Sequence, residues 1–283
     1  MPGRQRIQVH ALQRVSARLS LAALLVALVS LPAAAQTGLD PARELYNQGH
    51  YHEAIAAAGR LRTEATSDAA GLLVARSYLE LFRKTTDRAN LAAARQALAE
   101  IHPARLSDDD RTDYLIGLGE ALYLDDQFGP AAAIFESALG KSREQGPRTF
   151  DRVFDWWATC LDRQAQSGAA ADRDAVYRAV HDRAAVELER MPGSASAAYW
   201  LAASCRYLGD LTGAWDAAVA AWVRAPLTDD GGRALRADVD QLVLQAILPE
   251  RVRLMASGDA DRERVAAALR AAWDGVKKDW PNR

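Results

Sequence analysis

Apolar residues recur at helical spacing along the chain, and β-branched runs that alternate with polar residues at period two are missing. The clearest stripe lies near the C-terminus, where apolar residues stand three or four positions apart. Its members are Val265, Leu269, Trp273, Val276 and Trp280. Alanine dominates the apolar set, and alanine is the best helix former and lets helix axes approach closely. The pattern therefore predicts an all-α fold.

One unit of the pattern is especially well defined, the stretch YLIGLGEALYLDDQFGPAAAIFESAL from Tyr114 to Leu139. Large and small apolar residues follow a fixed order on both sides of a turn. They are Leu115, Leu118, Gly119, Leu122, Phe128, Ala131, Phe135 and Ala138. Pro130 stands at the start of the second predicted helix, where its missing N–H does no harm.

Two further units repeat this order. From Ser194 to Pro226, the corresponding positions are Leu201, Ala202, Leu211, Ala214, Ala218 and Ala221, and Gly209 and Asp210 make the turn. Near residue 50, Gly49, Tyr51 and Ala54 match a turn and a second helix, and a short first helix is expected to start near Asp40 as N-cap.

These units resemble the tetratricopeptide repeat, in which two antiparallel helices meet at small residues. The resemblance covers roughly residues 38–226 and implies a right-handed α-solenoid of stacked hairpins. Two weaker units, Ser67–Pro103 and Thr149–Pro192, are expected to have long loops, at Lys84–Asn90 and Gln164–Ala171, the latter preceding a helix over Asp172–Arg190.

Beyond Pro226 the repeat fades. We expect a loop at Asp229–Gly232, a helix over Ala234–Leu248 that Pro249 stops or restarts, and a last helix from Asp259 to Lys278. The predicted organisation is a signal peptide at 1–35, a repeat array at 36–226 and a capping region of the same solenoid at 227–283, because an open stack needs a cover.

The first 35 residues have the order of a secretory signal peptide. A basic stretch from Arg4 to Arg18 precedes the apolar run Leu19–Leu31, and Ala33-Ala34-Ala35 suits cleavage after Ala35. The run is short for a membrane span, which needs about 20 residues, although an uncleaved anchor is the alternative. We therefore expect a periplasmic or secreted protein without stable membrane insertion after cleavage.

An exported protein would place its two cysteines, Cys160 and Cys205, in an oxidising compartment where disulfides can form. They fall on helices expected to be neighbours, so they form either a disulfide or two small buried thiols. Without the first 35 residues, the chain has 31 basic and 37 acidic residues. This mildly acidic balance argues against nucleic-acid binding, which needs basic patches.

The resemblance also implies a partner surface, because the first helices of successive repeats line a concave groove. The groove positions carry acids, arginines and tyrosines, and Tyr and Arg are enriched where interfaces bind tightly. They are Asp113, Ile116, Glu120, Tyr123, Leu124, Arg152, Asp155, Thr159, Asp162, Arg163, Tyr199, Arg206 and Tyr207. Charged side chains at such positions on helices are also typical of faces that only water contacts.

We expect Trp156, Trp157, Trp200, Trp215 and Trp222 to lie in the core rather than form a ligand cage.

Motifs for catalysis are missing: the sequence has no H-E-x-x-H, G-x-S-x-G or P-loop. His50 and His52 fall in a turn without attached ligands, and Asp108-Asp109-Asp110 suits a helix N-terminus better than calcium. We therefore expect no enzyme activity, no cofactor and no bound metal.

The leading hypothesis for the function is a scaffold for a protein or peptide of unknown identity. The alternatives are a small-molecule-binding accessory of an envelope transporter and an enzyme with scattered site residues. The oligomeric state stays open.

Overall fold

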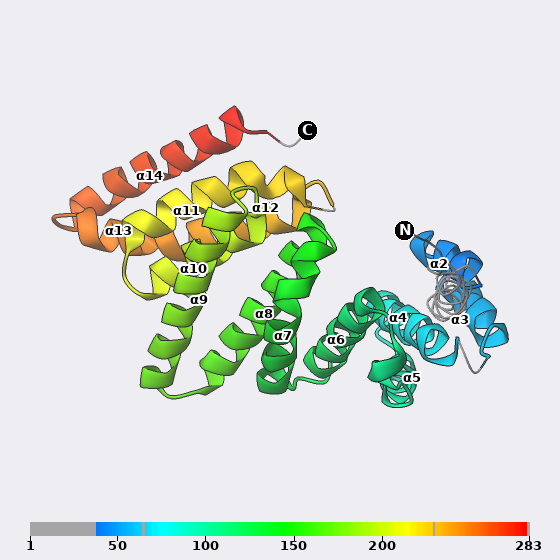
Figure 1. The fold of residues 1–283 in the computed structure, drawn as a ribbon. Coiled ribbons are helices and arrows are strands. Elements are labelled where there is room, and N and C mark those ends of the chain that lie inside the picture. Colours follow the sequence, from blue (N-terminus) through cyan, green and yellow to red (C-terminus); the bar gives the residue numbers. More distant parts are fainter. Residues whose placement is uncertain (1–37, 64–65, 229, 282–283) are drawn as a thin grey trace, which may run out of the picture.

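The computed structural model describes residues 38–63, 66–228 and 230–281, and these residues form helices joined by short turns (Figure 1). Within this part of the chain there is no strand, so the all-α prediction is confirmed. The predicted signal peptide and its cleavage point lie outside the described residues. None of the helices in the described part is long and apolar enough to cross a membrane.

Most of the helices form consecutive antiparallel pairs. The pairs are α2 (Asp40–Asn47) with α3 (Tyr51–Arg60), α4 (Ser67–Thr85) with α5 (Arg88–Ala99), α6 (Asp108–Tyr123) with α7 (Phe128–Glu144), α8 (Pro147–Ser167) with α9 (Ala170–Arg190), and α10 (Ala195–Tyr207) with α11 (Leu211–Arg224). Short 3₁₀ turns follow α5 and α11, as η1 (Pro103–Arg105) and η2 (Ala225–Leu227).

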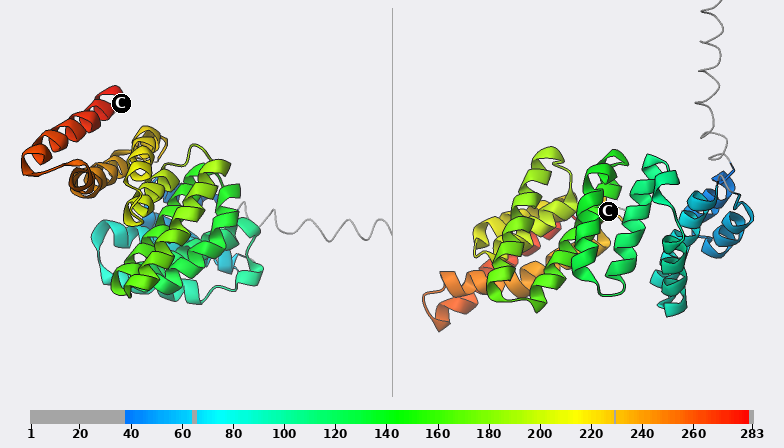
Figure 2. Two further views of the ribbon diagram at one scale, coloured as in Figure 1. Left: turned by 90° about the vertical axis from the view of Figure 1, so that its left-hand side faces the viewer. Right: turned by 60° about the horizontal axis from the view of Figure 1, so that its bottom comes forward.

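First helices of neighbouring pairs also pack on one another. α2 contacts α4, α4 contacts α6, α8 contacts α10, and α10 contacts α12 (Arg233–Leu242). The result is an elongated row of helices with α2 and α3 at one end and α13 (Leu248–Met255) and α14 (Asp259–Asp279) at the other (Figures 1 and 2). The core consequently consists of successive apolar clusters along the row.

Side-chain caps fix where several helices begin. The side chains of Asp87, Ser107, Ser194 and Asp210 accept hydrogen bonds from backbone N–H groups in the first turns of α5, α6, α10 and α11. Gly209 takes the left-handed conformation between α10 and α11, with φ +87°, which glycine adopts without steric cost. The predicted turn at Gly209 and Asp210 is therefore confirmed.

Small residues lie where the sequence pattern placed helix contacts. Ala131, Ala158, Ala202 and Ala214 are fully buried. At Gly119 on α6 the approach is closer still, because a Cβ atom built there would stand 2.5 Å from Cε1 of Phe135 on α7. The alternation of small and large residues therefore allows α6 and α7 to pack in direct contact.

The predicted tryptophan core is confirmed for Trp157, Trp200 and Trp222, which are all buried. Trp156 and Trp215 are half-buried and pack at the edges of the core. Cys160 and Cys205 are free, buried thiols on α8 and α10. Burial raises the pKa of Cys160 to about 12, so its thiol stays protonated near neutral pH.

The two long loops predicted in the weaker units are wrong. Only Thr86 and Asp87 separate α4 from α5, because Thr86 adopts a left-handed φ of 56° and Asp87 caps the next helix. Likewise, only Gly168 and Ala169 separate α8 from α9, which starts at Ala170 and not at Asp172. Asp40 is the first residue of α2 and not its cap, a position that Leu39 occupies.

The C-terminal region is helical with one irregular turn. α12 continues into a π-helical turn, η3 (Val243–Ile247), and then into α13, so Pro249 neither stops nor restarts the helix. Pro249 has no N–H to donate back along the helix, and it stands within the first turn of α13, right after the wide turn. In the C-terminal stripe Val265, Leu269 and Trp273 are buried, whereas Trp280 is exposed.

Candidate partner-binding pocket

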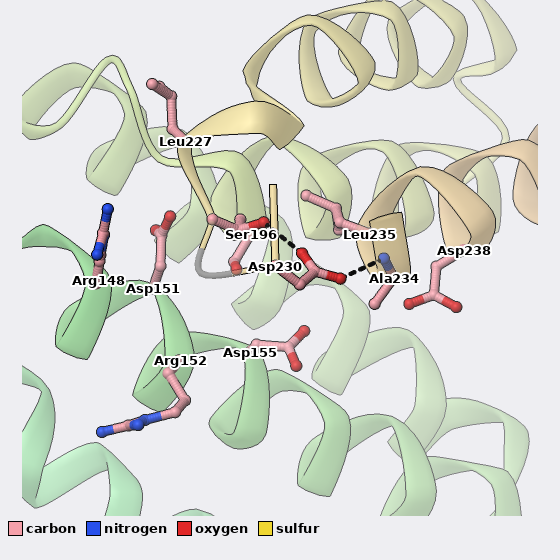
Figure 3. Close-up of a pocket in the computed structure, with 11 residues that line it drawn as sticks. Arg148, Asp151, Arg152, Asp155, Ser196, Leu227, Asp230, Ala234, Leu235 and Asp238 are labelled. Carbon is pink, nitrogen blue, oxygen red and sulfur yellow. Dashed lines mark hydrogen bonds between the residues drawn. The ribbon is translucent and has the colours of Figure 1, made fainter. Parts of the chain in front are cut away.

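A pocket of about 380 Å³ lies between the first helices α8, α10 and α12 and the segment that follows η2 (Figure 3). Charged residues dominate its wall. It is lined by Arg148, Asp151, Arg152, Asp155, Ser196, Leu227, Thr228, Asp230, Ala234, Leu235 and Asp238. Four of these residues are aspartates, and they come from α8, from α12 and from the segment between η2 and α12.

Asp151 and Asp155 are four residues apart on α8, so both face the same side of the helix. Asp151 accepts hydrogen bonds from the Ser194 hydroxyl and from the Ala195 backbone N–H, at 3.2 Å for the latter. Ser194 is also the cap of α10. Asp151 therefore fixes the start of α10 against α8, which sets one wall of the pocket.

Asp155 is half-buried and accepts a hydrogen bond from Nε1 of Trp200 at 2.9 Å. Burial raises the pKa of Asp155 to about 6, the Trp200 hydrogen bond opposes this shift, and the negative charges of Asp238 and Asp151 add to it. The charges that act on this carboxyl from within the pocket are therefore of its own sign.

The two aspartates from the C-terminal region behave differently. Burial also raises the pKa of Asp238 on α12. Asp230 instead accepts hydrogen bonds from the backbone N–H groups of Ala234 at 2.7 Å and Gly232 at 2.9 Å, which lower its pKa. Asp230 thus holds the start of α12, whereas Asp238 and Asp155 project from facing helices toward the pocket (Figure 3).

A second cavity of about 630 Å³ adjoins the first. It shares Arg148, Asp151 and Leu227 with the pocket, and its remaining wall comes from the turns at the ends of α7 and α9. Those residues are Gln145, Gly146, Pro147, Thr149, Met191, Pro192, Gly193 and Ser194. An apolar cavity therefore continues directly from an acidic one.

Closer to the N-terminus, an ionic network joins α4, α6 and α8. Glu120 is buried and pairs with Arg83 at 2.9 Å, and Arg76 pairs with Asp113. The Arg83 guanidinium lies 5.0 Å from the ring centre of Trp156. Burial raises the pKa of Glu120 despite the neighbouring arginines. Because these charges are paired within the chain, the network connects consecutive first helices.

The thirteen residues predicted to bind a partner are spread over α6, α8 and α10, and the structure brings only some of them together. Asp113 and Glu120 belong to the ionic network, and Ile116 is buried beside it. Arg152 and Asp155 line the acidic pocket. Leu124 and Thr159 are half-buried, and Arg163 is exposed.

The remaining predicted residues make contacts within the chain. Tyr123 packs edge-on against Phe128, and Tyr199 packs edge-on against Trp200. Asp162 accepts a hydrogen bond from the hydroxyl of Tyr177, whose ring stacks on Tyr207. Arg206 pairs with Glu250 on α13, with 2.5 Å between Nη2 and Oε1. These side chains are therefore engaged in contacts within the chain.

Sequence reasoning missed Asp151, Ser196, Asp230 and Asp238. Asp230 and Asp238 lie past the last repeat-like unit, where no pattern indicates which side of α12 faces α8. Ser196 stands two residues after the capping Ser194 and has no motif of its own. The doublet Asp151 and Asp155, spaced one helical turn apart, is the one signal in the sequence that marks this wall.

The wall of the pocket presents four aspartates and two arginines. In the part of the chain that the structure describes, no group of three or more His, Cys, Asp or Glu side chains is arranged to hold a metal ion. No protein-family model, no curated protein and no solved structure matches the chain.

Proposed function

We propose that the chain is an exported scaffold of tetratricopeptide-like hairpins that binds a protein or peptide segment along the surface of its first helices. The observation that carries the proposal is the packing of α8, α10 and α12, which leaves a pocket lined by charged side chains on this surface. Short stacked hairpins of this kind build extended binding surfaces in repeat proteins.

Several features support a peptide-like partner. The surface combines acidic and basic side chains with aromatic rings, and Arg152 lies 5.5 Å from the ring centre of Trp156. Such mixed surfaces suit extended segments, whose backbone and side chains need both apolar and polar contacts. The proposal of export is supported by the order of residues 1–35.

Site-specific photocrosslinking in the native host tests the proposal. A photoreactive amino acid placed at Arg152 or Arg163, both exposed on α8, is expected to capture one and the same protein. The matched control positions are Asp174 and Asp182, which are exposed on α9. Equal capture from α8 and α9, or no adduct from α8, would contradict the proposal.

Fractionation of the same cells tests the location. We expect the protein in the envelope or medium with Gln36 as its N-terminal residue, identified by N-terminal sequencing. A chain that keeps residues 1–35 and stays in the cytoplasm would refute export while leaving the crosslinking result to judge the scaffold role.

A further inference from the structure

Ser196 is an unusual residue in the wall of the acidic pocket. It is only 6% exposed, yet its hydroxyl has no hydrogen-bond partner among the described residues. Its oxygen is open to the cavity, because the fully buried side-chain atoms without a partner in the described part of the chain are Nε of Arg143 and Nε of Arg173. The hydroxyl is therefore available for a hydrogen bond with a ligand in the cavity.

Two carboxylates of the same pocket, Asp155 and Asp238, have acceptor capacity that the described residues leave largely unused. Asp238 and Asp155 come from facing helices, and the negative charge of Asp238 adds to the effect of burial in raising the pKa of Asp155. The Trp200 N–H is the hydrogen-bond donor given to Asp155. A carboxylate has acceptor capacity for more than one donor, so both aspartates can accept further hydrogen bonds from a ligand.

The arginines of the rim do not fill this role. Arg152 extends away from Asp155 in Figure 3, and its guanidinium packs over Trp156 and lines the small cavity beside Glu120. Arg148 extends from α8 toward the Leu227 side of the pocket, away from Asp238 (Figure 3). The wall of the pocket carries four aspartates and two arginines, so its formal charge is negative.

We propose that this pocket binds the ammonium group of a lysine side chain of the partner segment, between Asp155, Asp238 and the Ser196 hydroxyl. An ammonium group has three N–H donors, and these three side chains offer acceptors for all of them. The inference rests on the proposed function, because it assigns the lysine to the bound segment.

The adjoining cavity supports a peptide lysine over a free amine. It is lined by Pro147, Met191, Pro192 and Leu227, and it begins where the acidic pocket ends. A residue next to the lysine in an extended segment is within reach of it, since consecutive residues advance by about 3.3 Å. We therefore assign an apolar neighbour of the lysine to this cavity.

Calorimetric titration with capped peptides tests the inference on the mature chain. The probes are acetyl-Gly-Leu-Lys-Gly-amide and acetyl-Gly-Lys-Leu-Gly-amide, because the order of the two residues is set by the direction of the segment. We expect one of them to bind, and we expect replacement of its lysine by norleucine to weaken binding by about tenfold or more. Butylamine, which carries the ammonium without the apolar neighbour, is expected to bind about tenfold less tightly than the peptide.

Variants locate the bound ammonium. The double variant Asp155→Asn/Asp238→Asn removes both charges with little change in shape and is expected to weaken the lysine peptide by about tenfold or more. Ser196→Ala removes no hydrogen bond of the unliganded protein and is expected to weaken it by roughly threefold to tenfold. Asp174→Asn/Asp182→Asn, at exposed positions of α9, is the charge-matched control and is expected to bind like the wild type.

Each contrary result overturns the assignment. Equal binding of the norleucine peptide, unchanged binding by the double variant, or butylamine binding as tight as the peptide would exclude a peptide lysine in this pocket. Absence of binding for both peptides up to about 5 mM would do the same, because even a weak site is then ruled out. Crosslinking from Arg152 and Arg163 is independent of these peptides, so the scaffold proposal is judged separately.

Discussion

At the scale of single residues, Asp155 shows how a carboxyl in the wall of a pocket lowers the stability of the folded protein. Its carboxyl lies half-buried beside two other aspartates, so the charged form is disfavoured and its pKa rises from 3.8 to about 6. The folded chain therefore binds more protons at this residue than the unfolded chain between these two values. Stability falls as the pH rises through this window, and the loss is complete above it.

The substitution Asp155→Asn is expected to stabilise the protein at about pH 7.5. The amide keeps an oxygen that accepts from Trp200 and carries no charge to desolvate, so we expect a gain of about 1–2 kcal/mol in the free energy of unfolding. At about pH 3.5 the native aspartate is mostly protonated in both states, and most of the gain is expected to disappear. Urea unfolding of both proteins at the two pH values measures the difference.

The matched control is Asp182→Asn, at an exposed position of α9, which is expected to leave stability unchanged at both pH values. A loss of stability in Asp155→Asn at about pH 7.5 would show that the charged carboxyl is favoured in the folded protein. That result would also weaken the case for an uncompensated charge in the pocket.

At the scale of elements, the contact between α6 and α7 depends on the absence of a side chain at Gly119. The Cβ atom of an alanine there would stand 2.5 Å from a ring carbon of Phe135, and Phe135 is fully buried. Overpacking of this kind outweighs the better helix propensity of alanine. We expect Gly119→Ala to lower the free energy of unfolding by about 1–3 kcal/mol, measured by urea unfolding.

Gly140 on the same helix pair provides the control. It lies in the last part of α7, and a Cβ atom built there meets nothing within 4 Å. Gly140→Ala is therefore expected to stabilise the protein by about 0.5–1 kcal/mol, since the alanine restricts the unfolded chain and favours the helix. Equal effects of the two substitutions would mean that α6 and α7 do not approach at Gly119.

The elements that sequence reasoning predicted well are those that repeat. Gly119 and Ala202 could be recognised as contact positions because small residues recur at fixed places in the pattern, and their burial follows from it. The lengths of the turns were predicted poorly. The polar composition of Lys84–Asn90 suggests a long loop, but one left-handed residue, Thr86, and the helix cap Asp87 complete the turn. The pocket was only half predicted, because Asp238 comes from α12, beyond the last unit of the repeat.

At the scale of the whole molecule, most contacts join helices that are adjacent or next but one in sequence. A chain built in this way has a stability close to the sum of its units and their shared interfaces, and its ends open more easily than its middle. The C-terminal end is held by α14, where Trp273 is fully buried and packs edge-on against Trp215 and Trp222. Its Nε1 also donates to Asp240 on α12 at 2.7 Å.

The substitution Trp273→Ala is therefore expected to open one end of the molecule and leave the other intact. Removing a buried tryptophan costs about 3–5 kcal/mol, and this loss falls on the interfaces of α14 with α11 and α12. Hydrogen exchange measured by mass spectrometry is expected to accelerate in α11, α12 and α14 and to stay unchanged in α4, α5 and α6.

Trp280→Ala is the control, because that side chain is 53% exposed and its backbone oxygen still accepts from Trp222 Nε1. Faster exchange along the whole chain in Trp273→Ala would instead indicate one cooperative unit, since a stack of nearest-neighbour interfaces confines the damage to the units that lose a contact.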